Sequence, residues 1–341
     1  MKKKYGFGIV GCGVISKWHI AAINAIEDAY LVGVFDNYRP GAEKAADEHS
    51  CRLFETYEEM LNCDEVDIIS ICTPSGTHAP LTIKAANHKK NVIVEKPMAI
   101  TNSQLDELIG AVEQNGVKLA VISQLRFTDA IQKVKKAIED GELGDIVLGD
   151  IYMKYNRSQE YYDSSGWRGT WEMDGGGALM NQGIHGIDLL QYLLGGVKSV
   201  MSMCRTLARD IEVEDTANVL VEFKNGAIGV IQGTTSVEPG YPRIIQISGT
   251  RGTVEITEDI ITRWDVDGKS LLVDNSATSN VQSFRDPQGL DSNSHLLQVK
   301  DFISAIAQSR APLVDLYEGK KPVEIILAAY ESSKLGKKID L

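Results

Sequence analysis

The feature that most constrains the fold of this chain is the alternation of short apolar runs with helix-like segments over its first 124 residues. The apolar runs are continuous and rich in β-branched residues: YGFGIVG, YLVGVFD, VDIISICTP, NVIVEKP and VKLAVIS. Such runs are typical of strands that are buried on both faces of a parallel sheet. Helical patterns occupy the segments between them, at 14–29, 41–49, 56–62, 78–89 and 101–115. We therefore predict a doubly wound α/β domain over residues 1–124.

Residues 125–341 show a different pattern, which predicts an α+β domain with a large, mostly antiparallel sheet. A lysine-rich helix leads into the strand DIVLGDIYMKYN, and a loop rich in Gly, Trp and Tyr follows. A strongly apolar helix, ALMNQGIHGIDLLQYLLG, comes next. Two hairpins follow it, with turns at Asn225-Gly226 and near Gly252, and two helices at 294–309 and 321–336 finish the pattern. Asn-Gly between apolar strands is the strongest short hairpin pattern.

A glycine-rich turn after the first strand indicates a dinucleotide site. In GIVGCGVIS, Gly11, Gly13 and Ser16 occupy the three positions of a GxGxxG fingerprint, with Val14 and Ile15 between them. The first glycine allows a tight turn, and the second lets the backbone approach a pyrophosphate at the helix N-terminus. The fingerprint is informative because a strand precedes it and a helix follows it. The alternative is a glycine-rich turn that binds no ligand.

The second strand ends at Asp36, and this residue indicates which dinucleotide is bound. A carboxylate at this place accepts hydrogen bonds from the ribose hydroxyls of the adenosine and repels a 2′-phosphate. We therefore predict NAD as the cofactor, with NADP the less favoured alternative. Arg39, three residues further on, could pair with a phosphate, and Asp36 could instead be an ordinary turn residue at a strand end.

Two further strand ends carry polar residues, in CTPSGTH and EKPMAI. Parallel strands of one sheet end at the same edge, where ligands of open α/β sheets bind. We assign five residues of these ends to the cofactor site: Thr73, Pro74, His78, Glu95 and Lys96. His78 could equally be a packing residue at the start of a helix. Pro97 restricts the backbone of Lys96 and so aims its side chain, although a surface lysine before a proline is the simpler alternative.

A polar stripe lies on the apolar helix of the second domain. Asn181, His185 and Asp188 are spaced i, i+4 and i+7, so a regular helix would place them on one face. Unpaired polar groups are costly to bury, so this stripe needs partners. An imidazole can take a hydroxyl proton near neutral pH, and Asp188 could orient it. We predict a catalytic role for His185, and a hydrogen-bonded core histidine is the alternative.

Charge and cysteine content narrow the class of protein. The net charge of −12 argues against a partner such as nucleic acid or an anionic membrane surface. The five cysteines form no CxxC or Cys/His cluster, which predicts reduced thiols, no metal site and a cytoplasmic protein. The N-terminus lacks the apolar run of a signal peptide, and we find no apolar run long enough for a transmembrane helix.

Together, GIVGCGVIS, Asp36, CTPSGTH, EKPMA and WRGTWEMDGGGALMNQGIHGIDLLQYLLG resemble the Gfo/Idh/MocA family of NAD(P)-dependent oxidoreductases. The resemblance covers essentially the whole chain. It implies a dinucleotide-binding Rossmann domain over 1–124, and a domain for substrate binding and oligomerisation over 125–341. It also implies homodimers or homotetramers built on the large sheet. The MNQGIH form resembles members that act on nucleotide-linked amino-sugar uronates, such as UDP-N-acetylglucosaminuronate 3-dehydrogenases.

The resemblance also implies roles for single residues. The catalytic lysine of the family falls on Lys96 and its catalytic histidine on His185, and Arg168 falls where members contact the nicotinamide side of the cofactor. The family often has an aspartate four residues before the histidine. This chain has Asn181 there, which can bind a hydroxyl but cannot carry a proton.

These observations predict an oxidoreductase that transfers hydride from a secondary hydroxyl of a sugar, sugar nucleotide or cyclic polyol to NAD. Lys96, Asn181 and His185 are expected at the reacting hydroxyl. Aromatic rings and cations suit sugars, so five more residues are candidates for substrate binding, with packing as the alternative for each: Arg126, Tyr155, Arg157, Trp167 and Tyr241. An NAD-dependent glycosidase and a non-catalytic NAD-dependent sensor are the alternative functions.

Overall fold

The structure is a computed structural model that describes residues 3–271 and 292–341. Contacts between Cα atoms divide the chain into two compact units, each with its own sheet. Unit 1 contains Met1–Gln124 and Asp291–Lys320, and unit 2 contains Leu125–Leu290 and Lys321–Leu341.

Unit 1 is built on a six-stranded parallel sheet in the order β3-β2-β1-β4-β5-β6. The strands are β1 (Tyr5–Val10), β2 (Ala29–Phe35), β3 (Arg52–Leu53), β4 (Ile68–Ile71), β5 (Asn91–Val94) and β6 (Leu119–Val121). Every residue of β1, β4 and β6 is buried, which explains why these segments are apolar apart from Ser70 of β4. The strand order reverses between β1 and β4, and this switch point is where doubly wound sheets bind ligands, beyond the carboxyl ends of the strands.

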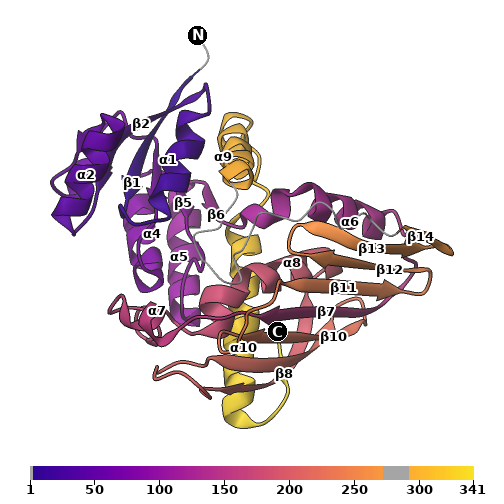
Figure 1. Cartoon of the computed structure of the whole chain (residues 1–341). Helices are drawn as coiled ribbons and strands as arrows, with labels where there is room; N and C mark the ends of the chain where they lie inside the picture. Colours follow the sequence, from indigo (N-terminus) through magenta and orange to yellow (C-terminus); the bar gives the residue numbers. More distant parts are fainter. Residues whose placement is uncertain (1–2, 272–291) are drawn as a thin grey trace. The chain divides into compact units, whose positions relative to one another are not determined.

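Helices connect these strands (Figure 1). They are α1 (Ser16–Asn24), α2 (Arg39–His49), α3 (Tyr57–Leu61), the 3₁₀ turn η1 (Ser75–Thr77), α4 (His78–Asn87) and α5 (Asn102–Asn115). Helix α1 packs on β1 and β2, whereas α4 packs on β4 and β5 and beside α5. The hydroxyls of Thr56 and Thr101 cap α3 and α5 by accepting a backbone N–H of the first turn.

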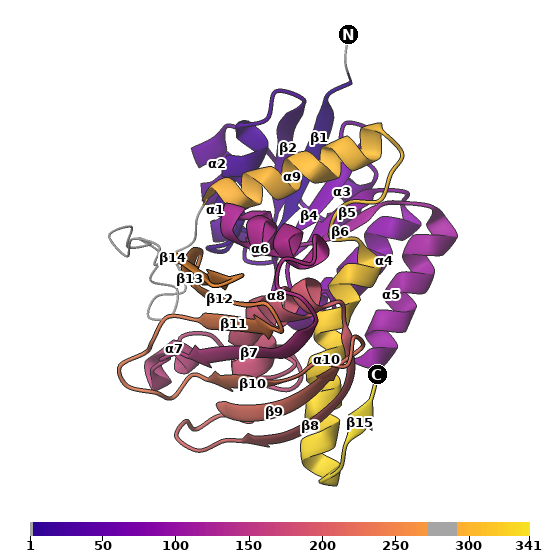
Figure 2. The same ribbon diagram turned by 90° about the vertical axis from the view of Figure 1, so that its right-hand side faces the viewer.

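A late helix, α9 (Ser292–Ala307), also belongs to unit 1 and lies beside α1 (Figures 1 and 2). Its residues Val299, Phe302 and Ile303 join the core that contains Phe7 and Ile9 of β1. We expected this segment in the second domain, and in the structure it clusters with the first. The apolar stripe of a helix predicts burial but does not say which sheet it covers.

Unit 2 is built on a nine-stranded sheet in the order β14-β13-β12-β11-β7-β10-β9-β8-β15. Its pairs are antiparallel except for the parallel pair of β7 and β10. The strands are β7 (Ile146–Lys154), β8 (Val197–Arg205), β9 (Thr216–Phe223), β10 (Ile228–Thr234), β11 (Ile244–Gly249), β12 (Gly252–Thr257), β13 (Ile260–Val266), β14 (Lys269–Leu271) and β15 (Ile339–Asp340). The hairpin around Asn225-Gly226 joins β9 and β10, and Gly226 has the positive φ of 90° that such turns require. The predicted fold class, a doubly wound parallel sheet with a second, mostly antiparallel sheet, is confirmed.

Six helical segments complete the described chain: η2 (Gln124–Phe127), α6 (Asp129–Glu139), α7 (Gln159–Asp163), the π-helix η3 (Ala178–Gly183), α8 (Ile184–Leu194) and α10 (Leu316–Leu335). Helix α8 packs on one face of the sheet at β7, as Figure 2 shows. The predicted single helix over 178–195 is therefore two pieces, a π-helical turn and a regular helix. In the described residues, no helix combines the length and apolarity that a membrane crossing needs.

Candidate functional site

The glycine-rich turn of unit 1 has the geometry of a dinucleotide cradle. Gly11 has a φ of 92°, and a Cβ atom there would lie 2.8 Å from the carbonyl carbon of Cys72, so only glycine fits. A Cβ atom on Gly13 would meet nothing within 4 Å, which leaves room for a ligand to approach the backbone. Val14 is exposed, Ile15 is half-buried, and the hydroxyl of Ser16 donates to the carbonyl of Gly13 at 2.7 Å. These positions fit the pyrophosphate of NAD at the N-terminus of α1.

The carboxylate of Asp36 lies at the end of β2, beside the same turn. It accepts the backbone N–H of Cys12 at 2.6 Å and that of Tyr38 at 2.8 Å. Two backbone bonds fix the carboxylate and leave further lone pairs for ribose hydroxyls. Arg39, the alternative partner for a 2′-phosphate, pairs instead with Glu43 and Glu55. Both observations favour NAD.

His78 connects the two strand ends that we assigned to the cofactor site. Its Nε2 atom lies 2.7 Å from the carbonyl oxygen of Thr73, and its Nδ1 atom lies 2.7 Å from that of Pro97. The ring is buried, and burial lowers its pKa. Pro74 precedes η1, and the hydroxyl of Thr73 accepts from Thr77. The ring thus lies between the backbones of the two strand ends, where a neutral imidazole donates its one N–H to one of these carbonyl oxygens. This arrangement supports the packing alternative, and the cofactor contact of His78 stays a prediction.

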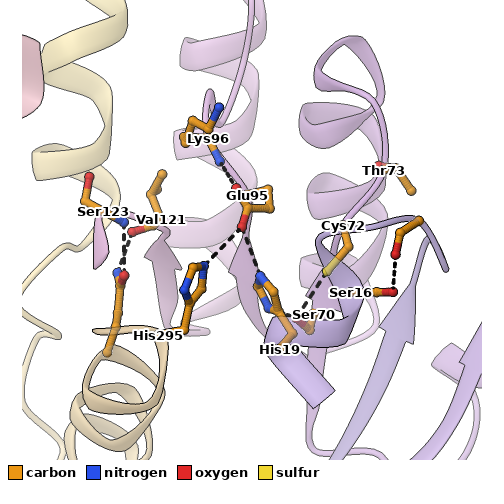
Figure 3. A network of polar contacts seen from close by, with 12 residues as sticks. Ser16, His19, Ser70, Cys72, Thr73, Glu95, Lys96, Val121, Ser123 and His295 are labelled. Carbon is orange, nitrogen blue, oxygen red and sulfur yellow. Dashed lines mark hydrogen bonds and ion pairs between the residues drawn. The ribbon is translucent and has the colours of Figure 1, made fainter. Parts of the chain in front are cut away.

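Lys96 is the second residue after β5 and the one half-buried residue in the run 92–100. Its backbone N–H donates to Oε2 of Glu95 at 3.2 Å, and its bond to Pro97 is cis. Its neighbours on both sides are buried, and the catalytic role of Lys96 stays a prediction. The side chain of Lys96 points away from the buried end of Glu95 in Figure 3.

Glu95 is part of a buried network that the sequence did not reveal. Its Oε1 atom lies 3.0 Å from Nε2 of His19 and 4.0 Å from Nε2 of His295, and Nδ1 of His19 lies 2.7 Å from the hydroxyl of Ser70 (Figure 3). Three segments far apart in the sequence therefore meet at Glu95. A histidine on the otherwise apolar face of residues 16–24 was the available sequence pattern for His19, and no local pattern distinguished His295.

In unit 2, Asn181 and His185 are half-buried on a segment whose other residues are mostly buried. The Nδ2 atom of Asn181 donates to Oδ1 of Asp174 at 2.6 Å, and its Oδ1 accepts from Gln182 at 3.0 Å. Asp174 is buried and also accepts the backbone N–H of Gly169. The position that often carries an aspartate in the family thus holds an amide bonded to a buried carboxylate seven residues earlier. No pattern in the sequence indicated Asp174, because a separation of seven residues across an irregular loop implies no proximity.

Asp188 does not serve His185 as one of our alternatives had it. Its carboxylate accepts from Nε of Arg126 at 2.8 Å and from Nη2 at 2.5 Å. Both side chains are buried, and the guanidinium of Arg126 also lies over the ring of Tyr192. We expected Arg126 at the substrate. Its complete burial and its bidentate ion pair assign it to packing instead, and we leave it out of the proposed site.

The hydrogen bonds that join Asp174, Asn181 and Gln182 extend to Arg157. Its Nη2 atom donates to Oε1 of Gln182 at 3.0 Å, and its guanidinium lies near the rings of Tyr155 and Tyr161. Tyr155 is buried, and burial raises the pKa of its phenol to about 12. Tyr155 is therefore a buried side chain that packs near Arg157. The predicted substrate contact of Arg157 stays a prediction.

The remaining predicted residues occupy the loop around α7 and the segment before β11. Arg168 lies 4.4 Å from the ring centre of Tyr161 and 5.3 Å from that of Trp167, and it donates to Ser164 at 2.8 Å. Trp167 is half-buried, and Tyr241 is exposed. The predicted cofactor contact of Arg168 and the substrate contacts of Trp167 and Tyr241 stay predictions.

The buried carboxylate of Glu214 accepts hydrogen bonds from the backbone at the start of the π-helical turn. It accepts the backbone N–H groups of Gly177 and Leu179 at 2.9 and 2.8 Å, and the hydroxyl of Tyr330 at 2.9 Å. Burial raises the pKa of Glu214 to about 7, although its hydrogen bonds favour the charged form. A Cβ atom on Gly177 would lie 1.9 Å from the carbonyl oxygen of Glu214, so the turn needs glycine there.

Comparison with known proteins places both parts of the chain in one family of oxidoreductases. Residues 5–123 match a family model described as an oxidoreductase family with an NAD-binding Rossmann fold, and residues 131–255 match the GFO/IDH/MocA C-terminal domain. A crystal structure of the WlbA dehydrogenase from Bordetella pertussis in complex with NADH and UDP-GlcNAcA is 34% identical. The match covers 99% of each chain with a TM-score of 0.88.

Two more relatives show how widely the similarity extends. The WlbA dehydrogenase from Chromobacterium violaceum, also in complex with NADH and UDP-GlcNAcA, is 32% identical over 99% of this chain and 96% of that one, with a TM-score of 0.88. The myo-inositol 2-dehydrogenase of Thermotoga maritima is 26% identical over 95% of each chain. Since both family models match in chain order and together span most of the sequence, the chain belongs to the GFO/IDH/MocA family of oxidoreductases, with NAD as its cofactor.

Proposed function

We propose that this oxidoreductase acts on a secondary hydroxyl of a nucleotide-linked sugar acid of the UDP-GlcNAcA type. The observation that carries the proposal is the 34% identity over 99% of both chains with a dehydrogenase bound to NADH and UDP-GlcNAcA. A second dehydrogenase with the same two ligands is 32% identical. The coarser substrate class is that of sugars, cyclic polyols and sugar nucleotides with a secondary hydroxyl.

The proposed chemistry assigns one proton and one hydride. Oxidation of a secondary alcohol removes hydride from carbon and a proton from oxygen, and a ketone results. NAD, when bound, supplies the hydride acceptor. His185 takes the hydroxyl proton on its imidazole, and Lys96 donates a hydrogen bond to the same oxygen and stabilises its developing negative charge. The partial exposure of their side chains supports these roles, because Lys96 and His185 are half-buried polar residues in mostly buried segments.

Asn181 is proposed to bind substrate rather than to move a proton. An amide has no titratable group near neutral pH, and the Nδ2 atom of Asn181 already donates to Asp174. Gln182 also donates to its oxygen, and the two bonds fix which way the amide faces, so that a sugar hydroxyl meets a group of defined orientation. Arg157, Arg168, Trp167 and Tyr241 are proposed to surround the remainder of the bound molecules.

A substrate panel tests the proposal. Purified protein is mixed with NAD and, separately, with UDP-GlcNAcA, UDP-GlcNAc, myo-inositol and glucose, and NADH is followed by absorbance. We expect the highest kcat/KM with UDP-GlcNAcA, and a lower value with UDP-GlcNAc, which lacks the carboxylate. Oxidation of myo-inositol alone would place the protein with the polyol dehydrogenases. Cleavage of a glycoside without net NADH would indicate the glycosidase alternative.

We also propose that two copies of the chain pair through the open face of the nine-stranded sheet. Side chains alternate along a strand, and Ile151 and Met153 of β7 would contact a Cβ atom on Gly186 of α8, so Leu148 and Tyr152 face the other way. That other face carries exposed apolar side chains on four neighbouring strands: Leu148, Met201, Met203, Leu220 and Ile228. Apolar side chains gathered on one face are typical of protein interfaces, and a second copy presents a self-complementary surface. A homotetramer would need a further interface.

A cytoplasmic location is part of the same proposal. The five cysteines, all in the described residues, are thiols rather than disulfides. Reduced thiols are the usual state of cysteines in the cytoplasm.

A further inference from the structure

The buried network at Glu95 lies directly beside the residue that we propose as a catalytic group. His19 comes from α1, Ser70 from β4, Glu95 and Lys96 from the end of β5, and His295 from α9 (Figure 3). The rings of His19 and His295 are each 1% exposed and Glu95 is 5% exposed. Buried ionisable groups are expensive unless they are paired, so a cluster of three needs a reason beyond filling space.

The two oxygens of the Glu95 carboxylate face different partners. Oε1 lies 3.0 Å from Nε2 of His19 and 4.0 Å from Nε2 of His295. Oε2 accepts the backbone N–H of Lys96 at 3.2 Å. The hydrogen bond to His19 therefore orients the same carboxylate that accepts the backbone N–H of Lys96, and the ring of His295 lies at ion-pair distance from it.

The electrostatics favour a charged carboxylate at this place. Burial alone would raise the pKa of Glu95, but the hydrogen bond and charge of His19, together with His295 and Lys96, lower it to about 2. For His19, burial lowers the pKa, whereas Cys72 and Glu95 raise it, to about 10. These shifts favour a charged pair of His19 and Glu95, and Nδ1 of His19 lies 2.7 Å from the hydroxyl of Ser70.

The backbone after Lys96 is held as well. The carbonyl oxygen of Pro97 lies 2.7 Å from Nδ1 of His78, whose other nitrogen reaches the carbonyl of Thr73. Lys96 is therefore fixed through its own N–H on one side and through the next carbonyl on the other. Its half-buried side chain extends from a segment that has little freedom to move.

We propose that His19, Glu95 and His295 form a positioning network for Lys96, which fixes its backbone and keeps one negative charge at the base of its side chain. This proposal rests on the proposed function, because it assumes that Lys96 acts on the substrate hydroxyl. The charge of Glu95 favours the protonated form of a neighbouring lysine, the form that can donate to the reacting oxygen. None of the three side chains of the network needs to touch substrate or NAD.

A metal ion is the other use that such residues could have. The candidate ligand atoms of His19, Glu95 and His295 lie within 4.8 Å of one another. Zinc bonds of about 2.0–2.2 Å in tetrahedral geometry place two ligand atoms about 3.4 Å apart. The separation of 4.0 Å between His295 and Glu95, and the direct contact of His19 with Glu95, favour the hydrogen-bonded network.

The test compares Glu95→Gln and His295→Gln with the wild-type protein, with Glu107→Gln as the matched control. Glu107 is exposed on α5 of the same unit. The pH dependence of kcat and KM is measured along with the affinity for NADH by fluorescence and the thermal melting temperature. The groups that face Glu95 or its partners are His19 on α1, His295 on α9, Cys72 after β4, His78 on α4 and Lys96 itself.

For Glu95→Gln we expect kcat to fall about tenfold or more, because a hydrogen bond to a charged group is lost. NADH affinity and KM should change little. The basic limb of the kcat profile should move to lower pH by about one unit, since the ammonium form loses its neighbouring carboxylate, and the acidic limb should stay in place. His295→Gln should lower kcat by a smaller factor and leave the basic limb in place, because the carboxylate of Glu95 stays charged, and Glu107→Gln should behave as wild type.

The outcomes separate this proposal from the proposed function. If Lys96→Ala is inactive while both network variants melt as wild type and keep kcat within about twofold with an unmoved basic limb, the positioning role alone is overturned. If Lys96→Ala keeps full turnover, both proposals fail. Stoichiometric metal in the purified protein, lost in Glu95→Gln, would overturn the positioning role in favour of a metal site.

Discussion

At the scale of single residues, Asp36 shows how one carboxylate serves two purposes. It receives backbone N–H groups from Cys12 and Tyr38, so it closes the turn that cradles the pyrophosphate. Its remaining lone pairs are placed for ribose hydroxyls, and its charge repels a 2′-phosphate. Structure and cofactor choice therefore depend on the same side chain.

The first prediction concerns Asp36→Asn. The amide keeps an acceptor for the turn but removes the charge, so kcat/KM with NAD should fall about tenfold and the ratio of NADP to NAD efficiency should rise. Steady-state kinetics with both cofactors checks this. Asp47→Asn, an exposed change on α2, is the control. An unchanged cofactor ratio in Asp36→Asn would remove Asp36 from cofactor selection.

The second prediction concerns the proposed base, His185. Replacement by glutamine keeps a hydrogen-bonding side chain but cannot take a proton, so kcat should fall by about 10²- to 10⁴-fold. The acidic limb of the wild-type pH profile should disappear, whereas NADH affinity should not change. The exposed His88 provides the control variant His88→Gln. A kcat for His185→Gln near that of wild type would contradict the role of the imidazole.

At the scale of elements, the π-helical turn η3 depends on the buried carboxylate of Glu214. The first N–H groups of a helix have no partner within the helix, and here a glutamate from a distant segment accepts two of them. The turn carries Asn181 and leads into α8 with His185. The π-helical geometry therefore sets the spacing between Asn181 and His185. Such turns are frequent at functional sites.

The third prediction follows from the pKa of Glu214, which is raised from 4.5 to about 7. A raised carboxyl pKa means that the folded state binds the proton more tightly, so this group favours folding below pH 4.5. Its contribution falls as the pH rises through about 7. The loss amounts to about 3 kcal/mol, since one pKa unit corresponds to about 1.4 kcal/mol. Glu214→Gln should remove this slope.

The measurement is urea unfolding of wild type and Glu214→Gln between pH 4.5 and 6.5. This window lies above the range in which Glu95 loses its charge in the folded state, and below that of His19. The exposed Glu331→Gln on α10 is the control and should keep the wild-type slope. Parallel pH profiles for wild type and Glu214→Gln would show that Glu214 titrates normally.

At the scale of the whole molecule, the open face of the nine-stranded sheet is the feature with the widest consequence. Leu220 of β9 stands opposite Met201 of β8 and Val230 of β10, so apolar side chains meet across three strands. Leu220 is 60% exposed, which is unusual for the middle of such a row. An unpartnered apolar row on a broad sheet is the surface that a second copy would cover.

The fourth prediction is that Leu220→Glu dissociates the oligomer. A charge at the centre of an apolar contact loses its hydration without gaining a partner, so the equilibrium should shift to monomer. Light scattering after size exclusion reports the mass directly. Leu335→Glu, an equally apolar and half-exposed position on α10, should leave the mass unchanged. A monomeric wild type, or an unaltered mass in Leu220→Glu, would contradict this interface.

The sequence by itself determined the parallel sheet, the glycine turn and the residues that end its strands. These features are local, because buried strands read as apolar runs and a tight turn demands glycine wherever it occurs. The resemblance of short motifs then identified Lys96 and His185 as candidates. Neither inference required knowing which segments meet.

Only the tertiary structure decided which side chains pair with one another. His295 reaches Glu95 across 200 residues of sequence, Asp174 bonds Asn181 through an irregular loop, and Asp188 pairs with Arg126 rather than with His185. The apolar stripe of α9 also packs on a sheet that its position in the chain did not indicate. Hydrogen bonds and ion pairs depend on distances between atoms, and the fold sets these distances by bringing remote segments together.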